Sequence, residues 1–393
     1  MSISVEGGYL IQLLSSVLHG SQPPQPTAGL DWGKLYRVAA FHRVTAMASY
    51  AIDRLPIDEQ PGSELLGRFR TDRSVAVARE ANQHVHLEQL LEALRSSSIA
   101  CLPLKGCILK ELYPSAEMRF MVDVDLLIDD QQIEEVKGIM SGLGYELRSQ
   151  GETHDLYLKP PFMTVEIHRQ LMPERVTYRN YFQSVWSRVG TDDRRCYLSD
   201  EDFYIYLIAH LAKHWTSGGM GIRSIMDVWL YTRRYRELTH NEYTRAELQS
   251  IGLRTFAENV ERLGQVWFGD EPGDQWHEEM TDFVIASGSA GTRQNAIIME
   301  AAKDSKDEAP FALARCASLL RLLFPPLKMM WVGYPYLHRL PVLLPLAWVC
   351  RGVKSVLIKG KNTAQVLGRA LSVTESEIAG MRTFHKKMGL TDR

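Results

Sequence analysis

The chain has 393 residues, of which 45% are hydrophobic and 23% are charged, as is ordinary for a soluble globular protein. This composition excludes a disordered or collagen-like chain. A disulfide framework is excluded as well, since the five cysteines are odd in number, scattered and without a CxxC pair. The longest strongly apolar run, Leu340–Cys350, is about half of the ~20 residues that a membrane-spanning helix needs. We therefore expect a cytoplasmic protein without a transmembrane segment, in which this run forms a buried helix or at most an interfacial one.

Charge is distributed unevenly along the chain. The net charge is -2, yet the segment from Phe311 to the end holds 13 Lys and Arg against 3 Asp and Glu, which makes it +10. Such a basic segment indicates either a polyanionic partner or a surface that docks on the acidic remainder of the chain. Because Leu340–Cys350 is typical of a core, we favour docking.

The first 98 residues have the pattern of helices. A polar, proline-rich stretch from Ser21 to Ala28 interrupts the helices predicted over residues 1–75. Apolar residues then recur at helical spacing between Ala76 and Ser98, which predicts one long amphipathic helix.

A small mixed sheet is predicted over residues 99–170. Short apolar or alternating runs bounded by turn residues indicate strands, and Pro160-Pro161 is typical of a tight connection between the last two. The predicted strands cover residues 99–104, 121–128, 145–148, 154–158 and 164–169. The predicted helical segments within this region cover residues 107–113 and 130–141.

After Tyr178 the pattern returns to helical periodicity. The predicted helices cover residues 178–189, 200–216, 221–237, 244–266, 275–304, 310–323, 326–358 and 363–388. The predicted fold class is therefore α+β, a small mixed-sheet core flanked by helical N- and C-terminal regions. The predicted domains are a helical region 1–98, an α/β core 99–175, a helical region 176–310 that completes the active-site cleft, and a basic helical region 311–393.

Lys105 and Gly106 lie at a predicted strand-to-helix turn. Glycine lets a phosphate approach the backbone closely, and the first amides of the following helix offer N–H donors to an anion. Lys105 adds a mobile positive charge. The turn predicts a phosphate site, with an ordinary structural turn as the alternative.

Asp123 and Asp125 lie on the second predicted strand. Side chains at i and i+2 of a strand point to the same face, so the two carboxylates project together while Val122, Val124 and Leu126 face the core. Like charges at this spacing repel one another unless a cation binds between them. Mg²⁺ is such a cation, because it takes carboxylate oxygens, water and substrate phosphates. The alternative is a strand end with two solvated acids.

Glu166 and His168 share one face of the last predicted strand. A third carboxylate on a neighbouring strand completes a cage for two metal ions ~3.5–4 Å apart, which stabilise the attacking and leaving oxygens of a phosphoryl displacement. The 43 residues from Asp123 to Glu166 leave room for a helix and two strands. His168 is either a partner of Glu166 or a contact to the substrate, unless it is a buried histidine bonded to the backbone.

These residues resemble a known family. The chain is similar to the nucleotidyltransferase superfamily typified by DNA polymerase beta in three successive motifs, L-K-G, R-x-x-x-D-x-D-L-L-I and V-E-I-H. Within it, the chain looks most like the bacterial group of uncharacterised nucleotidyltransferase family proteins, and it is also similar to the nucleotidyltransferase toxins of abortive-infection systems. The resemblance covers at least residues 80–235.

The resemblance implies a role for each matching residue. Asp123 and Asp125 are the expected metal-binding aspartates, and Glu166 is the third carboxylate, which can also act as base on the attacking hydroxyl. The expected cofactor is Mg²⁺ or Mn²⁺. Gly106 stands where the superfamily has a Gly-Gly or Gly-Ser turn that holds the triphosphate, and Cys107 departs from that pattern.

Arg119 lies four residues before Asp123. A guanidinium there is suited to grip phosphate oxygens with two N–H groups, which makes Arg119 a predicted nucleotide contact together with Lys105 and His168. The alternative for Arg119 is an ion pair with Glu117 or a cap on the sheet edge.

His210 lies on a predicted helix that is followed by the glycine-rich loop Ser217–Gly221 and then by Arg223 and Asp227. The resemblance includes a histidine-containing helix followed by an Arg and an Asp at this spacing. We expect His210 and Arg223 to line the nucleotide site, with a structural Arg223–Asp227 pair as the alternative.

The sequence therefore predicts an enzyme that moves a nucleoside monophosphate from a nucleoside triphosphate to a hydroxyl acceptor and releases pyrophosphate. The alternative is a catalytically inactive nucleotide-binding or interaction module that retains the fold. A mutually repulsive set of three carboxylates favours the enzyme, whereas the altered turn at Cys107 favours the module. The docking interpretation of the basic segment favours a small-molecule or protein acceptor over RNA.

Overall fold

The structure is a computed structural model that describes residues 4–151, 153–174, 176–192 and 195–289. Beyond these it describes residues 291–292, 295–296, 298–299, 320, 323–331, 333–354, 368 and 372–390. The described residues form helices around a five-stranded mixed sheet, which confirms the predicted α+β class. They fall into two compact units, Met1–Lys213 with Met220–Ser289, and His214–Gly219 with Ala290–Arg393. The predicted domain boundaries stay a prediction.

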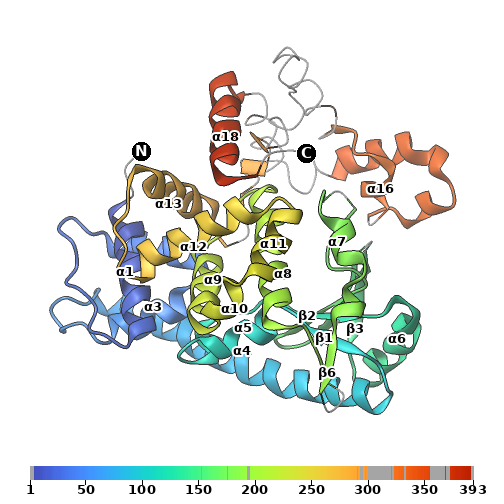
Figure 1. Cartoon of the computed structure of the whole chain (residues 1–393), viewed down its shortest axis with the longest axis horizontal. Coiled ribbons are helices and arrows are strands. Elements are labelled where there is room, and N and C mark those ends of the chain that lie inside the picture. The colour runs from blue at the N-terminus through green and yellow to red at the C-terminus, as the bar shows by residue number, and fades with distance from the viewer. Residues whose placement is uncertain are drawn as a thin grey trace. The chain divides into compact units, whose positions relative to one another are not determined.

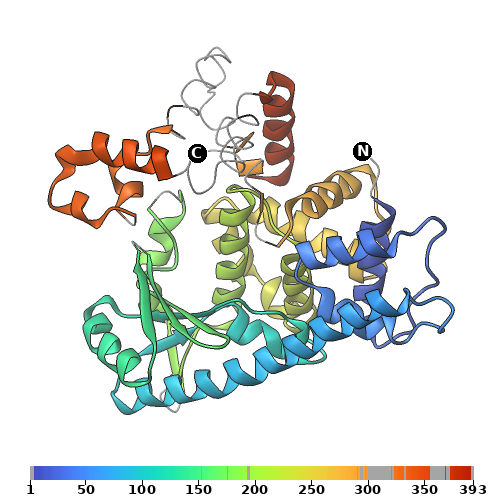
Figure 2. The same cartoon turned by 180° about the vertical axis from the view of Figure 1, so that it is seen from behind.

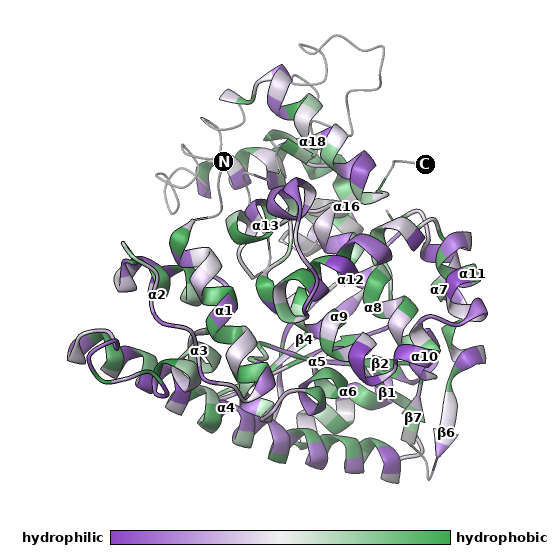
Figure 3. Cartoon of the chain, turned by 60° about the vertical axis from the view of Figure 1, so that its left-hand side comes forward, coloured by the Kyte–Doolittle hydropathy of each residue, from purple (hydrophilic) through white to green (hydrophobic). Residues whose placement is uncertain are grey.

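Four helices precede the sheet, and the last of them is longer than the sequence pattern predicts. They are α1 (Val5–His19), α2 (Trp32–Phe41), α3 (Thr45–Ile52) and α4 (Ser63–Ser96). The predicted start of the long helix at Ala76 is wrong. Between Phe69 and Ala76, the first two buried residues of α4, the chain is mostly polar, so the apolar periodicity is interrupted within the helix. Figure 3 shows hydrophilic and hydrophobic residues alternating along α4, as expected for a helix that packs by one side only.

The sheet has the strand order β1-β2-β5-β4-β3. Its strands are β1 (Cys101–Pro103), β2 (Val124–Ile128), β3 (Glu146–Gln150), β4 (His154–Lys159) and β5 (Met163–His168). The pair β2–β5 is parallel and the other pairs are antiparallel. All five predicted strands are confirmed, although β2 begins at Val124, so that Asp123 lies just before the strand instead of on it.

One face of the sheet carries the core of this region. Val124, Leu126, Val165 and Ile167 pack there with apolar residues of α4 and of α6 (Ile133–Gly142). Figures 1 and 2 both show α4 running along this side of the sheet. Because strand side chains alternate between faces, the polar residues between these apolar ones point to the opposite face.

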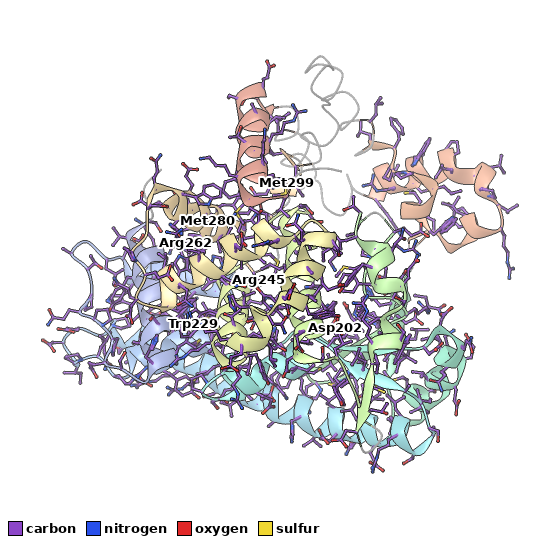
Figure 4. The ribbon with its side chains drawn as sticks, viewed as in Figure 1. Asp202, Trp229, Arg245, Arg262, Met280 and Met299 are labelled. Atoms are coloured by element: carbon purple, nitrogen blue, oxygen red, sulfur yellow. The ribbon has the colours of Figure 1, made fainter. Side chains whose placement is uncertain are left out.

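Helices follow the sheet along the chain. They are α7 (Arg179–Gln183), α8 (Asp200–Trp215), α9 (Ile222–Arg234), α10 (Arg236–Thr239), α11 (Glu242–Ser250), α12 (Arg254–Phe268) and α13 (Gln275–Ser287). Helices α9 and α12 pack closely, because Gly264 leaves room for the Cβ of Trp229, a side chain labelled in Figure 4. The Trp229 ring lies 5.7 Å from that of Phe268. The predicted single helix 244–266 is two helices, since Gly252 has a φ of 71° between them.

A two-stranded hairpin between the sheet and α8 was missed. Its strands are β6 (Gly190–Asp192) and β7 (Arg195–Tyr197). The segment is polar and short, with no apolar alternation to indicate a strand.

The second unit contains α16 (Leu327–Met330), a helix over residues 344–354 and α18 (Glu375–Met388). The prediction that Leu340–Cys350 is buried is wrong for most of the run. Ala347 packs in a small cluster with Met330 and Leu337, whereas most other apolar residues of the run are exposed, with Val342 78% exposed. Much of the basic segment, including residues 311–319 and 355–367, lies outside the described residues. No described helix is both long and apolar enough to cross a bilayer.

A buried ion pair ties α4 to the segment between β1 and β2. Lys110 is 4% exposed, and its Nζ lies 2.7 Å from Oε1 of Glu80. Removing one partner of such a pair leaves the other charge uncompensated. We expect Lys110→Met to lower the free energy of unfolding by about 2–3 kcal/mol, measured by urea denaturation. Lys110→Met combined with Glu80→Leu should recover most of that loss, and a single variant as stable as the wild type would contradict the role of the pair.

Candidate active site

Asp125 and Glu166 are neighbours in the sheet. They lie directly opposite each other in the parallel pair β2–β5, and Asp123 lies just before β2. Asp125 is 5% exposed, and Asp123 and Glu166 are half-buried. The three predicted carboxylates therefore come together on the sheet face opposite the apolar core.

Two cationic or hydrogen-bonding groups bind Asp125. Lys105 Nζ lies 2.7 Å from Asp125 Oδ1, and His168 Nε2 lies 2.8 Å from the same oxygen. Burial alone would raise the pKa of Asp125, but the Lys105 ammonium and the His168 hydrogen bond outweigh it and hold the pKa well below its usual range. Lys105, in turn, has its pKa raised by Asp125 against the effect of burial. Asp125 is thus ionised across the range in which proteins fold.

Glu166 lies between two histidines. His168 Nε2 is 3.2 Å from Glu166 Oε2, and His154 Nε2 is 3.6 Å from Glu166 Oε1. One potential ligand atom from each of these three residues lies within 4.8 Å of the others. His168 therefore bonds to carboxylates, which favours the predicted partnership with Glu166 over a backbone-bonded core histidine.

His154 is a site residue that the sequence interpretation missed. It lies on β4 directly opposite His168, and the two rings are 5.0 Å apart. The predicted hairpin could have revealed it. Lys159 and Met163 pair across the Pro160-Pro161 turn, so equal numbers of residues back from Lys159 and forward from Met163 place His154 opposite His168. Burial lowers the pKa of His154, while Glu166 opposes that shift.

Asp123 is the strained member of the acidic group. Burial, followed by the charges of Asp125 and Glu166, raises its pKa to about 6, against smaller opposing effects of Lys105 and Arg223. A carboxylate in this position is costly to ionise when no further cation is near.

The Gly106 turn closes over this region at short range. A Cβ on Gly106 would lie 2.4 Å from Met121 Sδ and 2.6 Å from Arg119 Nη1, so a larger residue would have to displace both. The expectation of unpaired amides after the turn is wrong in part. The N–H of Cys107 donates to the carbonyl of Leu104 at 3.1 Å, so this amide serves the turn itself. Cys107 Sγ lies 3.9 Å from the Asp125 carbonyl oxygen.

Arg119 forms a buried bidentate pair with Asp227. Its Nε and Nη2 each donate to an Asp227 oxygen at 2.8 Å, and the Tyr113 hydroxyl donates to the same carboxylate at 2.8 Å. The predicted alternative of a pair with Glu117 is wrong, because Glu117 accepts from Tyr50 and Ser115 instead. Arg119 Nη1 is the group that faces the Gly106 turn.

Arg223 and His210 lie on the two helices beside the acidic residues. Arg223 Nη1 donates to the carbonyl of Phe120, and no described residue is hydrogen-bonded to its buried Nε. The predicted alternative of an Arg223–Asp227 pair is wrong, since Arg119 holds Asp227. The ring of His210 lies 5.9 Å from that of Tyr206. Tyr206 is buried, and its pKa is raised by burial and affected in opposite directions by the charges of Lys105 and Asp125.

The donor set fits a divalent cation. Carboxylate oxygens are the ligands that Mg²⁺ prefers, and Mn²⁺ also accepts imidazole nitrogen. Burial and the charges of Asp125 and Glu166 raise the pKa of Asp123, and a bound cation would relieve the repulsion between these carboxylates. Asp123, Asp125, Glu166 and the two histidines could hold such an ion.

A family model described as uncharacterised nucleotidyltransferase matches residues 28–269. The chain belongs to this family. No curated protein and no solved structure matches it. The matched residues run from α2 through α12, and they include the sheet, the acidic group and the two helices with His210 and Arg223.

Membership of the nucleotidyltransferase family indicates what kind of ligand a group of acidic residues would bind. Nucleotidyltransferases usually use divalent metals, and the group of carboxylates and histidines matches that requirement. Nucleotidyl transfer in general is therefore the activity that membership of the family indicates, and a nucleoside triphosphate is the substrate that it implies.

The raised pKa of Asp123 predicts a pH-dependent stability effect in the metal-free nucleotidyltransferase. Its pKa is higher in the folded chain than in the unfolded chain, so ionisation favours unfolding as the pH rises from about 4 to about 6. Asp123→Asn removes that effect. We expect the variant to be more stable than the wild type by about 2 kcal/mol at pH 7.5 and by little at pH 4, measured by urea denaturation with a chelator present.

The exposed neighbour Asp130 offers a matched control for this measurement. Its side chain is 78% exposed and lies 3.5 Å from Arg169. Asp130→Asn should leave the difference between the two pH values unchanged. An Asp123→Asn variant with the same stability difference at both pH values would refute the assigned strain.

Proposed function

We propose that this chain is a metal-dependent nucleotidyltransferase that moves a nucleoside monophosphate from a nucleoside triphosphate to a hydroxyl acceptor and releases pyrophosphate. The observation that carries the proposal is the set of three carboxylates on one sheet face, beside the Gly106 turn, in a nucleotidyltransferase family member. A binding module has no evident need for a mutually repulsive group of this kind.

Asp123, Asp125 and Glu166 would hold Mg²⁺ or Mn²⁺. Both hydrogen bonds to Asp125 use Oδ1, so its Oδ2 is the oxygen that we assign to the metal. When bound, the metal neutralises phosphate charge and polarises the reacting oxygens. His168 and His154 fix the direction of the Glu166 carboxylate through their ring nitrogens.

The proposed reaction forms one bond and breaks one. The acceptor hydroxyl oxygen bonds to the α-phosphorus while the bond to the β-phosphate oxygen breaks, and pyrophosphate leaves with that electron pair. Glu166 accepts the hydroxyl proton. The protein otherwise contributes positioning and electrostatic stabilisation, as in other phosphoryl transfers.

The nucleotide contacts are assigned to the basic groups around the acidic set. Lys105 and the backbone at Gly106 are assigned to the triphosphate, together with Arg119 Nη1 and Arg223 Nε. Arg119 has its other donors committed to Asp227, so it can approach a phosphate with one N–H group while its position stays fixed. His210 is assigned to the same site, and His168 acts on the bound nucleotide through the two carboxylates that it contacts.

The proposed acceptor is a hydroxyl of a small molecule or a protein. We place the enzyme in the cytoplasm. The acceptor assignment does not depend on the chemistry of the acidic group and has its own test. Labelled nucleoside triphosphate, Mg²⁺ and fractionated cell extract would reveal which fraction takes up the label.

An inactive nucleotide-binding module is the second candidate. The ion pair of Lys105 with Asp125 favours it, because the pair already neutralises the most buried of the three carboxylates. Cys107, which stands where the superfamily has Gly or Ser, favours it as well. A module would gain thermal stability from nucleotide and Mg²⁺ without any pyrophosphate release.

The decisive test uses Glu166→Gln and Asp125→Asn. We expect each to lower pyrophosphate release by at least about 100-fold, because each removes a carboxylate that acts in the transition state. Glu166→Gln is the cleaner variant, since Asp125→Asn also leaves Lys105 without its partner.

Two exposed acids serve as matched controls for that assay. Glu146→Gln on β3 and Asp130→Asn after β2 remove the same charges outside the acidic group. Full activity in Glu166→Gln would overturn the assignment, as would equal losses in the controls.

A further inference from the structure

Two arginines meet at one aromatic ring beside the acidic group. The guanidinium carbon of Arg79, on α4, lies 5.0 Å from the centre of the Phe120 ring, and that of Arg43 lies 5.8 Å from the same centre. Arg79 also lies 4.9 Å from the ring centre of Phe162. Two cations and two rings from four separate segments thus form one cluster, here called the arginine–phenylalanine cluster.

The positive charges of this cluster are not neutralised. Neither Arg43 nor Arg79 forms an ion pair with a described residue, and the buried Nε of Arg79 has no hydrogen-bond partner among them. Burial, with a further contribution from Arg43, lowers the pKa of Arg79. Arg43 is exposed and Arg79 is half-buried, so two like charges lie side by side where an anion from solution can reach them.

The backbone holds Arg43 in an uncommon conformation. Its φ is 57°, in the left-handed region that residues other than glycine rarely adopt. The preceding residue fixes it there. His42 is buried, its Nε2–H donates to the Ile285 carbonyl at 3.1 Å, and its Nδ1 accepts from the Ile222 N–H at 3.3 Å.

The cluster and the acidic group share one short segment. Phe120 lies three residues before Asp123, and its carbonyl accepts from Arg223. Gln83 of α4 donates at 3.4 Å to the carbonyls of both Met121 and Phe162. The two rings and the approach to Asp123 are therefore held together by α4.

We propose that Arg43 and Arg79 form an anion-binding subsite that takes a phosphate or carboxylate group of the acceptor, separate from the triphosphate contacts. Two guanidinium groups match the oxygen geometry of either anion, and both lie over the Phe120 ring, which supports them from one side. The acceptor in this account carries an oxyanion as well as the reacting hydroxyl. Only the assignment of the anion to the acceptor rests on the proposed function, since anion binding by the two arginines can be tested alone.

The test measures the affinity for inorganic phosphate and for acetate by titration calorimetry at low salt. Each titration is done with and without saturating Mg²⁺ and a non-hydrolysable nucleoside triphosphate, which blocks the triphosphate site. We expect at least one anion to bind in both conditions. Arg79→Gln and Arg43→Gln should each weaken that binding about tenfold or more, because each removes a charge-assisted contact. The anion that binds more tightly identifies the acceptor group.

Arg68→Gln is the matched control. Arg68 also lies on α4, with its guanidinium carbon 4.3 Å from the Tyr36 ring centre, but no second arginine shares that ring. This variant should bind the anion like the wild type. If Arg79→Gln proves unstable in thermal denaturation, Arg79→Lys replaces it in the test. Because Arg79→Lys keeps the charge, its anion affinity should lie between those of Arg79→Gln and the wild type.

Three results would overturn the subsite. They are no anion binding by the wild type, equal binding in Arg43→Gln and wild type, or anion binding that saturating nucleotide abolishes, which would assign the arginines to the triphosphate. Failure of the proposed function gives a different pattern. In that case no pyrophosphate is released, while the anion still binds the wild type and is lost in the two variants.

Discussion

Repulsion among carboxylates on one face of the sheet is the constraint to which the surrounding structure responds. The parallel register of β2 and β5 forces Asp125 and Glu166 side by side, and Asp123 lies just before them. Lys105 and His168 compensate Asp125, which lies deepest, while Asp123 is left with a raised pKa. A site that neutralises one acid internally and leaves another strained is prepared for a cation supplied with the substrate.

The parts of this site that could be predicted from sequence are those set by local geometry. The two-residue period of a strand places Asp125 opposite the apolar core, and the same period explains why Glu166 and His168 share a face. A glycine between a strand and a helix marks a close approach, which the contacts of Gly106 with Met121 show directly. Local rules also located all five strands, because each is bounded by turn residues.

The parts that could not be predicted depend on contacts between distant segments. Asp227 follows Arg119 by 108 residues, and nothing in the local pattern of either indicates that they pair. Arg43 and Arg79 meet only because α4 and the turn before α3 converge on Phe120. Sequence spacing assigned each arginine a partner within one helical turn or none at all, and tertiary packing overrode that assignment.

The Arg119–Asp227 pair connects two parts of the family match, the segment before the acidic residues and the helices after the sheet. Arg119 precedes the acidic residues, whereas Asp227 lies on α9 with Arg223 one turn earlier. The pair therefore sets the distance between α9 and the segment that leads to Asp123, and Tyr113 reinforces it from a third segment. A sheet without these helices would keep its carboxylates and Lys105, but it would lose Arg223 and the carboxylate that holds Arg119. The proposed site accordingly draws on the sheet together with its helices, and the family match over residues 28–269 spans both.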